Sequence, residues 1–268
     1  MNLLTILLLL NISKFLARFI SHQGLDLIVN QFKRTNKRLL LLDYDGTLSP
    51  FFINPNQAIP NASLLQLLTN LTNDTKNDVV ILSGRDKYTL DRWFAGINLQ
   101  LAAEHGIWIK NNNNWQMSRP LTKEWHAQIL PVLENFMDRL PGTFIGKKEF
   151  SIVWHYRGAD LEKVEQLAKE LTEHLVNLTA NVDIQILLGN KIVEAKCAGV
   201  GKDTAALYFI AKNDYDFILA IGDDATDDDT FRVLPQHAYS IKVGINASHA
   251  KFNLRSQNDV ITLLSRFV

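Results

Sequence analysis

The feature that most constrains the fold is an apolar run that ends in two carboxylates. Residues 39–42 are all leucine, and Asp43 and Asp45 follow, with Gly46 and Thr47 close behind. Because side chains alternate along a strand, the two carboxylates can face the same side where such a strand ends. Carboxylates in such a place cost free energy unless they bind a cation or take part in chemistry. For this segment alone, a strand followed by an ordinary Asp-Gly turn is the simpler interpretation.

Three further segments carry a polar group after a strand or at the start of a helix. In chain order these groups are Ser83 after the apolar residues 79–82, Lys202 at the start of a helical pattern, and an acidic cluster after residues 217–221 that comprises Asp223, Asp224 and Asp227. Together with the D-x-D-x-T run at residues 43–47, this order resembles the haloacid dehalogenase-like phosphatases. Each segment alone is a weak signal, whereas the four in this order are a specific one.

Beyond residue 36 the apolar patterns alternate between short strands and helices. Aliphatic density predicts buried parallel strands over residues 39–42, 79–82, 99–103 and 217–221. Helical spacing predicts helices over residues 63–70, 87–94, 202–211 and 226–233. This alternation predicts an α/β fold with a doubly wound, mostly parallel, Rossmann-like sheet and a ligand at the carboxyl ends of its strands.

The middle of the chain breaks this rhythm. The expected elements there are strands over residues 107–110 and 115–117 around a run of four asparagines, helices over 122–139 and 161–177, and strands over 149–156, 183–188 and 191–195. This mixture predicts an α+β cap inserted into the core, where it would exclude water and select the substrate. The expected domains are a core of residues 37–108 and 196–268, a cap of residues 109–195, and an N-terminal helical segment of residues 1–36.

The N-terminal segment begins with an apolar run. Residues 3–10 are apolar apart from Thr5, and Phe19 and Ile20 continue a helical stripe. The run is too short to span a bilayer and lacks the basic flank of a secretory signal. We expect a helix that packs on another surface, while an interfacial helix and the remnant of a preceding domain stay open as alternatives.

Charge and cysteine content limit the partners. The 28 basic and 28 acidic residues cancel, so we expect no nucleic-acid partner and no stable insertion into a membrane. The single cysteine, Cys197, cannot form an internal disulfide, which is consistent with a reducing cytoplasm. We therefore expect a cytoplasmic protein.

The polar residues suit phosphoryl transfer. Asp43 is the candidate nucleophile, because a carboxylate that attacks phosphorus splits one displacement into two easier steps through an aspartyl-phosphate. Asp45 is the candidate acid and base. The expected donors to the phosphate are Thr47, Ser83, Gly84 and Lys202.

Acidic groups that face a phosphate dianion would repel it, so a hard cation is required. Mg²⁺ held by carboxylates, waters and substrate oxygens fits this need. The resemblance implies that its ligands are Asp43, the backbone carbonyl of Asp45, and Asp223. Asp224 and Asp227 would lie behind these ligands.

Longer segments narrow the resemblance to the trehalose-6-phosphate phosphatases. The matching segments are 42–48 (LDYDGTL), 82–85 (LSGR), 103–106 (AEHG), 154–157 (WHYR), 189–194 (GNKIVE) and 222–228 (GDDATDD). The resemblance covers about residues 37–268 and is closest to the phosphatase half of bifunctional trehalose synthase–phosphatase proteins. It implies Mg²⁺-dependent hydrolysis of trehalose 6-phosphate to trehalose and phosphate, and a functional pairing with a trehalose-phosphate synthase.

The same resemblance implies that side chains of the cap bind the disaccharide. These are Lys148, His155, Arg157 and Glu194, with Arg85 at the junction of core and cap. Charged groups that hold two hydrogen bonds suit sugar hydroxyls in a dry cleft. The simpler alternatives are a solvated Lys148 and surface ion pairs of His155 and Arg157. Glu104 and His105 fit either a hinge or a contact.

One departure from the family pattern keeps other functions open. Gly146 and Lys147 stand where family members often carry acidic residues, so the usual grip on trehalose is less certain. The alternatives are a phosphatase of another sugar phosphate, of the sucrose or mannosyl type, and a non-catalytic regulatory domain that binds a sugar phosphate. A regulatory domain would be expected to lose Asp43, Asp45 or Lys202, and this chain keeps all three.

Overall fold

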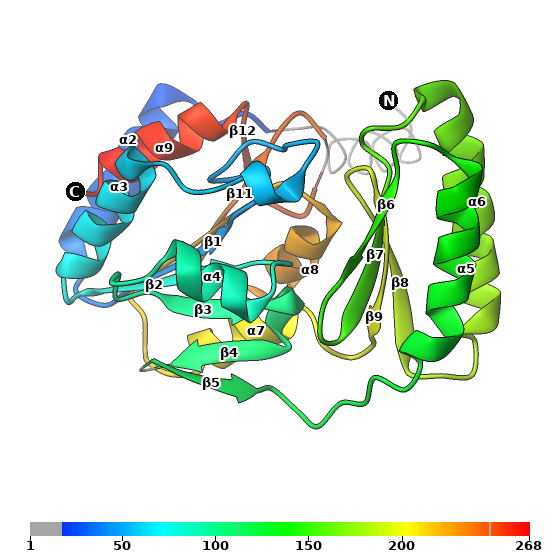
Figure 1. Ribbon diagram of the computed structural model, residues 1–268. Helices are drawn as coiled ribbons and strands as arrows, with labels where there is room; N and C mark the ends of the chain where they lie inside the picture. Colours follow the sequence, from blue (N-terminus) through cyan, green and yellow to red (C-terminus); the bar gives the residue numbers. More distant parts are fainter. Residues whose placement is uncertain (1–17, 112, 247) are drawn as a thin grey trace, which may run out of the picture.

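The computed structural model describes residues 18–268, except residues 112 and 247. Most of the apolar N-terminal run, residues 1–17, lies outside the described residues. Within the described part the strands form two sheets, a larger one on the left of Figure 1 and a smaller one on its right. No helix of this part is both long and apolar enough to cross a membrane.

The larger sheet is mainly parallel, as the sequence predicts. Its strands are β1 (Arg38–Asp43), β2 (Asn77–Leu82), β3 (Gln100–Ala103), β4 (Trp108–Asn111), β5 (Asn114–Met117), β10 (Phe217–Gly222), β11 (Tyr239–Val243) and β12 (Phe252–Leu254). They lie in the order β12-β11-β10-β1-β2-β3-β4-β5. Only the pairs that involve β4 are antiparallel among these described strands, which places a hairpin at one edge.

The register of β1 brings the predicted site residues to one edge. Leu42 pairs with Ile221 of β10 on one side and with Ile81 of β2 on the other. The three strands therefore end side by side, and Asp43, Ser83 and Asp223 follow at that shared edge.

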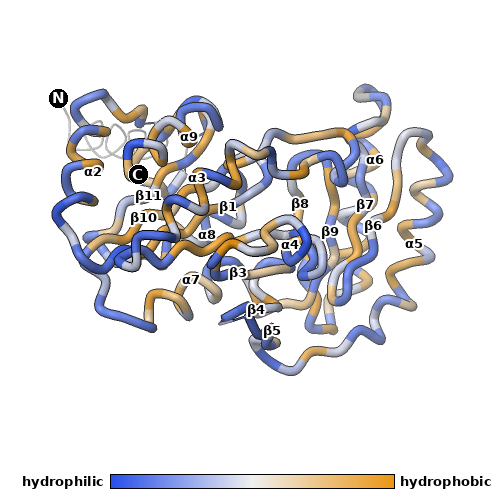
Figure 2. Tube along the Cα trace, turned by 60° about the vertical axis from the view of Figure 1, so that its left-hand side comes forward, coloured by the Kyte–Doolittle hydropathy of each residue, from blue (hydrophilic) through white to orange (hydrophobic). Residues whose placement is uncertain are grey.

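Helices cover both faces of this sheet, which confirms the doubly wound class. On one face are α2 (His22–Arg34), α3 (Ala62–Asn73), α4 (Lys87–Trp93) and α9 (Gln257–Ser265), and on the other are α7 (Lys202–Ile210) and α8 (Ala225–Val233). The leucines of β1 alternate between the two: Leu40 and Leu42 join the first layer, and Leu39 and Leu41 the second. The central strands are accordingly mostly hydrophobic in Figure 2.

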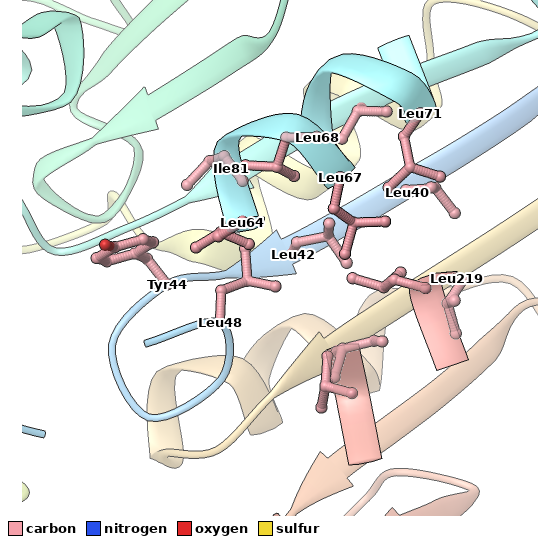
Figure 3. Packing of buried hydrophobic residues seen from close by; sticks show 14 of the residues in the cluster. Leu40, Leu42, Tyr44, Leu48, Leu64, Leu67, Leu68, Leu71, Ile81 and Leu219 are labelled. Carbon is pink, nitrogen blue, oxygen red and sulfur yellow. The ribbon is translucent and has the colours of Figure 1, made fainter. Parts of the chain in front are cut away.

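The packing of α3 shows how the sequence dictates this arrangement. Its buried leucines recur at helical spacing and point toward the sheet in Figure 3, where Leu40 and Leu42 of β1 and Ile81 of β2 lie: Leu64, Leu67, Leu68 and Leu71. Asn61 caps the helix, since its side chain accepts a hydrogen bond from Leu64 N at 2.8 Å. Burial of each such leucine contributes about 1.5–3 kcal/mol.

The smaller sheet is antiparallel and has its own hydrophobic core. Its strands are β6 (Phe144–Lys147), β7 (Ser151–His155), β8 (Ile184–Gly189) and β9 (Ile192–Cys197), in the order β6-β7-β9-β8. Helices α5 (His126–Arg139) and α6 (Leu161–Leu178) cover the face that is turned away from the larger sheet (Figure 1). Ile152 and Trp154 pack under these helices, so the alternate residues Val153 and His155 face the larger sheet.

The hairpin of β4 and β5 differs from the boundary expected from the sequence. Because β4 pairs with β3, the larger sheet continues to Met117 instead of ending at residue 108. Packing explains the difference, since Ile109 joins the core layer under α7. We therefore propose that the cap begins after this hairpin.

The start of the described chain also departs from expectation. Phe19 and Ile20, expected to continue an apolar helix, are extended instead. Phe19 forms a bridge with Asn253 of β12, and Ile20 N donates to Asn253 O at 3.1 Å. The edge strand β12 offers free backbone groups, which explains the pairing. In the described part of this segment, residues 18–36, the helix is α2, and its Phe32 is buried in the core.

Candidate active site

Asp43 lies at the end of β1 and is almost completely buried, with 4% of its surface exposed. One carboxylate oxygen, Oδ1, accepts a hydrogen bond from Lys202 Nζ at 2.6 Å. The other oxygen, Oδ2, is buried without a hydrogen-bond partner among the described residues. Burial raises the pKa of Asp43 to about 8, against the opposing charge of Lys202. This carboxylate is therefore held in place with one oxygen left for a ligand.

Lys202 is the first residue of α7 and is 2% exposed. Its ammonium group donates to Asp43 and, at 2.9 Å, to Asp227 Oδ1. An ammonium group has three donors, so two contacts leave one N–H for a further acceptor.

An acidic loop connects β10 to α8. Asp224 caps α8, because its Oδ1 accepts from Thr226 N at 2.8 Å and from Asp227 N at 3.1 Å. Asp227 Oδ2 accepts from the backbone of Asp223 and Asp224 at 2.9 and 3.1 Å. These two carboxylates thus shape the loop, whereas Asp223 Oδ1 is buried without a hydrogen-bond partner in the described part of the chain.

The carboxylates of Asp43, Asp223 and Asp227 can each offer an oxygen within 4.8 Å of the others. Burial, reinforced by the charges of Asp227 and Asp224, raises the pKa of Asp223 to about 8. Lys202 alone does not balance this charge, and two orphaned carboxylate oxygens lie within the group. Oxygen donors and excess negative charge suit a hard divalent cation, so these residues fit Mg²⁺. Both oxygens of Asp227 already accept hydrogen bonds, which suits a place behind the ligands.

The turn after β1 brings Gly46 against this group. Gly46 has φ of +90°, a conformation that favours glycine, and a Cβ there would overlap with the Asp223 carboxylate. Thr47 is fully buried, and its Oγ1 has no hydrogen-bond partner among the described residues. An unpaired buried hydroxyl at this edge is available as a donor to a bound anion.

Ser83 and Gly84 follow β2 on the neighbouring side. Ser83 is 1% exposed, and its Oγ accepts a hydrogen bond from Arg85 N at 3.1 Å. A Cβ at Gly84 would lie 2.8 Å from Nε2 of His105, so glycine leaves room for that imidazole.

The carboxylate of Asp45 is engaged by Arg85. The guanidinium donates from Nε to Oδ2 at 2.7 Å and from Nη2 to Oδ1 at 2.5 Å. Arg85 also donates to Pro55 O at 2.7 Å and lies over the ring of Trp93. Both oxygens of Asp45 are thus held in a two-point ion pair, so proton transfer by Asp45 requires release from Arg85.

Glu194 and Lys148 meet on the inner face of the smaller sheet. Glu194 is 1% exposed, and its Oε1 accepts from Lys148 Nζ at 2.7 Å. Its Oε2 lies 3.0 Å from Nε2 of His105, a residue of the turn that follows β3. Burial opposes the charge of Glu194, but Lys148 and His105 hold its pKa well below the usual range.

His155 and Arg157 lie near the end of β7, and among the described residues neither forms the ion pair with a surface acid that was the simpler alternative. The His155 ring stacks on Phe144 with centroids 4.4 Å apart, and burial with the charge of Lys148 lowers its pKa to about 4. Arg157 donates to Asn190 O at 2.6 Å and lies over Phe51, a residue of the loop after β1. Arg157 thus connects the end of β7 in the smaller sheet with the loop after β1 of the larger sheet.

Sequence reasoning left two residues of this region without a role. Glu104 and His105 both reach from the end of β3 to the smaller sheet, since Glu104 Oε2 accepts from Phe150 N at 2.9 Å. The residue types of the segment Ala-Glu-His-Gly do not distinguish a hinge from a contact. That distinction depends on backbone conformation.

The mainly parallel sheet, with carboxylates, a lysine and hydroxyls at its carboxyl edge, agrees with the fold class expected from the resemblance to the haloacid dehalogenase-like phosphatases. The family model described as trehalose-phosphatase matches residues 41–264. The chain therefore belongs to the trehalose-phosphatase family.

Individual relatives agree with this assignment. The chain is 36% identical over 250 residues to a bifunctional trehalose-6-phosphate synthase/phosphatase of Thermoproteus tenax, with 93% of this chain and 34% of the relative covered. It is 34% identical over 231 residues to a trehalose-phosphatase of Saccharomyces cerevisiae, with 77% and 26% covered. It thus spans about a third or less of these relatives' length.

A solved structure matches over nearly its whole length. The C-terminal domain of the Candida albicans trehalose-6-phosphate phosphatase superposes with a TM-score of 0.88 at 27% identity. The match covers 93% of this chain and 98% of that domain. Both sheets of the present structure therefore have counterparts in a single known domain.

Proposed function

We propose that this chain hydrolyses trehalose 6-phosphate to trehalose and phosphate, with Mg²⁺ and through an aspartyl-phosphate at Asp43. The observation that carries the proposal is the carboxylate of Asp43, which is held by Lys202 through one oxygen and whose other oxygen has no hydrogen-bond partner among the described residues. A nucleophile needs this combination of a fixed position and an available lone pair.

In the first step an oxygen of Asp43 forms a bond to phosphorus while the bond from phosphorus to the sugar oxygen breaks. Asp45, once protonated and released from Arg85, donates its proton to that sugar oxygen. In the second step water attacks the phosphorus of the acyl phosphate, Asp45 accepts a proton from the water, and the Asp43 carboxylate is regenerated.

The phosphoryl group would be held by Thr47, Ser83, Gly84 and Lys202. Support comes from the unpaired hydroxyl of Thr47 and the remaining N–H of Lys202. We propose that Asp43, the backbone carbonyl of Asp45, and Asp223 hold Mg²⁺, with Asp224 and Asp227 behind them. Bound Mg²⁺ would neutralise charge on the phosphoryl oxygens.

The disaccharide would contact the inner face of the cap through Lys148, His155, Arg157 and Glu194, with Arg85 at the junction. Support comes from the pairing of Glu194 with Lys148 on this face. The departure at Gly146 also fits, because a Cβ there would lie 3.0 Å from His155 Nε2. Glycine at this position leaves the imidazole free to turn toward a sugar.

The setting of the reaction is likewise a proposal. Relatives such as the Thermoproteus tenax protein are named as both synthase and phosphatase, so we propose that this chain works next to a trehalose-phosphate synthase. The free, buried thiol of Cys197 is compatible with the cytoplasm.

Phosphate release from a panel of sugar phosphates, with Mg²⁺ and with EDTA, tests the proposal. We expect metal-dependent release with a strong preference for trehalose 6-phosphate. A preference for sucrose 6-phosphate or a mannosyl phosphate would keep the core chemistry and overturn the assignment of the cap. Binding of a sugar phosphate by folded protein without release from any member would instead support a regulatory domain.

A further inference from the structure

The turn after β3 holds two consecutive residues in an unfavourable conformation. Glu104 and His105 have φ of 47° and 59°, although neither is glycine. An L-residue in this region costs about 1–2 kcal/mol and persists only where the surroundings enforce it. Both side chains are buried, with 1% and 7% of their surfaces exposed. The contacts that these side chains make must therefore explain the strained turn.

His105 reaches the cap through Glu194. Nε2 of His105 lies 3.0 Å from Oε2 of Glu194, whose other oxygen accepts from Lys148. Burial lowers the pKa of His105, while that of Glu194 is held low, so a neutral imidazole donates its Nε2–H to a carboxylate. One core residue thus orients two groups of the sugar-facing surface.

Glu104 secures the same part of the cap. Its Oε2 accepts from Phe150 N at 2.9 Å, within the loop from β6 to β7 that carries Lys148. The contact is buried on both sides. The two strained residues therefore fix the loop of Lys148 and the carboxylate of Glu194 from one point of the core.

On its other side, His105 contacts the turn proposed to bind the phosphate. Its backbone N–H donates to Ser83 O at 2.9 Å, and its ring leaves no room for a side chain at Gly84. His105 therefore touches both the phosphate-side turn and the sugar-side carboxylate.

We propose that His105 is a positioning residue for sugar selectivity, which holds Glu194 and Lys148 at a fixed distance from the phosphate-binding turn, with Glu104 securing the Lys148 loop. The inference rests on the proposed function, because it concerns the sugar of the same substrate. In this proposal the strained turn sets the distance between the phosphate-binding turn and the side chains of Glu194 and Lys148. That distance must match the length of the substrate.

The test compares trehalose 6-phosphate with p-nitrophenyl phosphate, which has no sugar. His105→Asn suits the test because asparagine tolerates positive φ but is too short to reach Glu194. We expect kcat/KM for trehalose 6-phosphate to fall about ten- to hundredfold, mainly through KM, as for loss of a hydrogen bond to a charged group. Turnover of the aryl phosphate should stay within about twofold, since nothing on the phosphate side changes in charge.

A double variant shows whether His105 acts through Glu194. If it does, His105→Asn adds little to the loss already caused by Glu194→Gln. Arg139→Ala is the control, because it removes an ion pair on the outer helices of the cap, from Arg139 Nη1 to Glu170 Oε1 at 2.8 Å, away from the Lys148 loop. The control should leave the ratio of the two substrates unchanged, and thermal melting should confirm that all variants fold.

Each outcome decides the inference. An equal loss on both substrates would make His105 purely structural, and fully additive losses would show that it does not act through Glu194. Wild-type protein that turns over the aryl phosphate without preferring trehalose 6-phosphate would overturn the proposed function, and this inference with it. A wild-type preference that survives in His105→Asn would overturn this inference alone.

Discussion

At the scale of single residues, burial governs the chemistry of the site. Asp43 and Asp227 share one lysine, at 2.6 and 2.9 Å from Lys202 Nζ. In a buried site, removal of the lysine would leave two uncompensated carboxylates, which is far costlier than loss of a surface pair. The same burial acts on His155, whose pKa is lowered to about 4. A partly buried histidine that is kept neutral makes the free energy of unfolding depend on pH.

The sign of this dependence follows from proton binding. Between pH 6.5 and 4 the unfolded chain binds a proton at His155 that the folded chain does not, so stability falls as pH is lowered through that range. His155→Gln removes this titration. We expect urea unfolding at pH 7.5 and at pH 5 to show a smaller loss of stability for the variant than for the wild type. An equal or larger loss of stability in the variant would contradict the lowered pKa of His155.

At the scale of elements, β1 and the turn behind it set the geometry. The strand places Asp43 between the ends of β2 and β10, and the turn brings Gly46 against Asp223. On the other side, Asp224 caps α8 and so fixes the acidic loop. The positions of the site residues are thus set largely by where these strands and turns end.

Gly46→Ala tests the close approach in this turn. The added Cβ would meet the Asp223 carboxylate, so we expect phosphatase activity and Mg²⁺ affinity to fall at least about tenfold. Positive φ alone would cost about 1–2 kcal/mol of stability. Gly96→Ala is the matched control, because Gly96 has φ of +80° and nothing within 4 Å of an added Cβ. Equal activity of the two variants would show that the close approach of Gly46 to Asp223 is not needed for activity.

At the scale of the whole molecule, the hydrophobic core of the cap meets the larger sheet through Ile107, which packs into that core just before β4, and through a set of polar contacts. The contacts from core to cap include those of Lys87 with Glu149, of Glu104 with Phe150 and of His105 with Glu194, and the stacking of Arg157 on Phe51. Such contacts are weak enough to break when a cap opens for substrate. In the proposed function, selectivity would then reside in the groups that close over the sugar.

Arg157→Ala tests whether the cap selects the sugar while the core carries out the phosphate chemistry. We expect KM for trehalose 6-phosphate to rise about tenfold, with a much smaller effect on p-nitrophenyl phosphate, because Arg157 lies on the cap beside Phe51. Arg139→Ala is the control, since Arg139 pairs with Glu170 on the outer helices at 2.8 Å. Equal effects of Arg157→Ala on the two substrates would make Arg157 structural.

The core of the fold was predictable because its strands are aliphatic runs with sharp polar ends. Asp43, Ser83 and Asp223 could be placed at one edge from such runs alone. The ion pair of Asp45 with Arg85 could not, since it joins side chains 40 positions apart through rotamer choice. Residues 109–117 of the β4–β5 hairpin were expected in the cap, because the short strands carry no sign of which sheet they extend. The positive φ of His105 depends on its buried partners rather than on its own type.

The most direct test of the central claim is to locate the phosphoryl group on the enzyme. In Asp45→Asn the second step should be slow, so acid quenching after mixing with phosphate-labelled trehalose 6-phosphate and Mg²⁺ should leave label on the peptide that contains Asp43. The variant Asp43→Asn should carry none and release no phosphate. Label on another residue, or phosphate release by Asp43→Asn at the wild-type rate, would contradict the account.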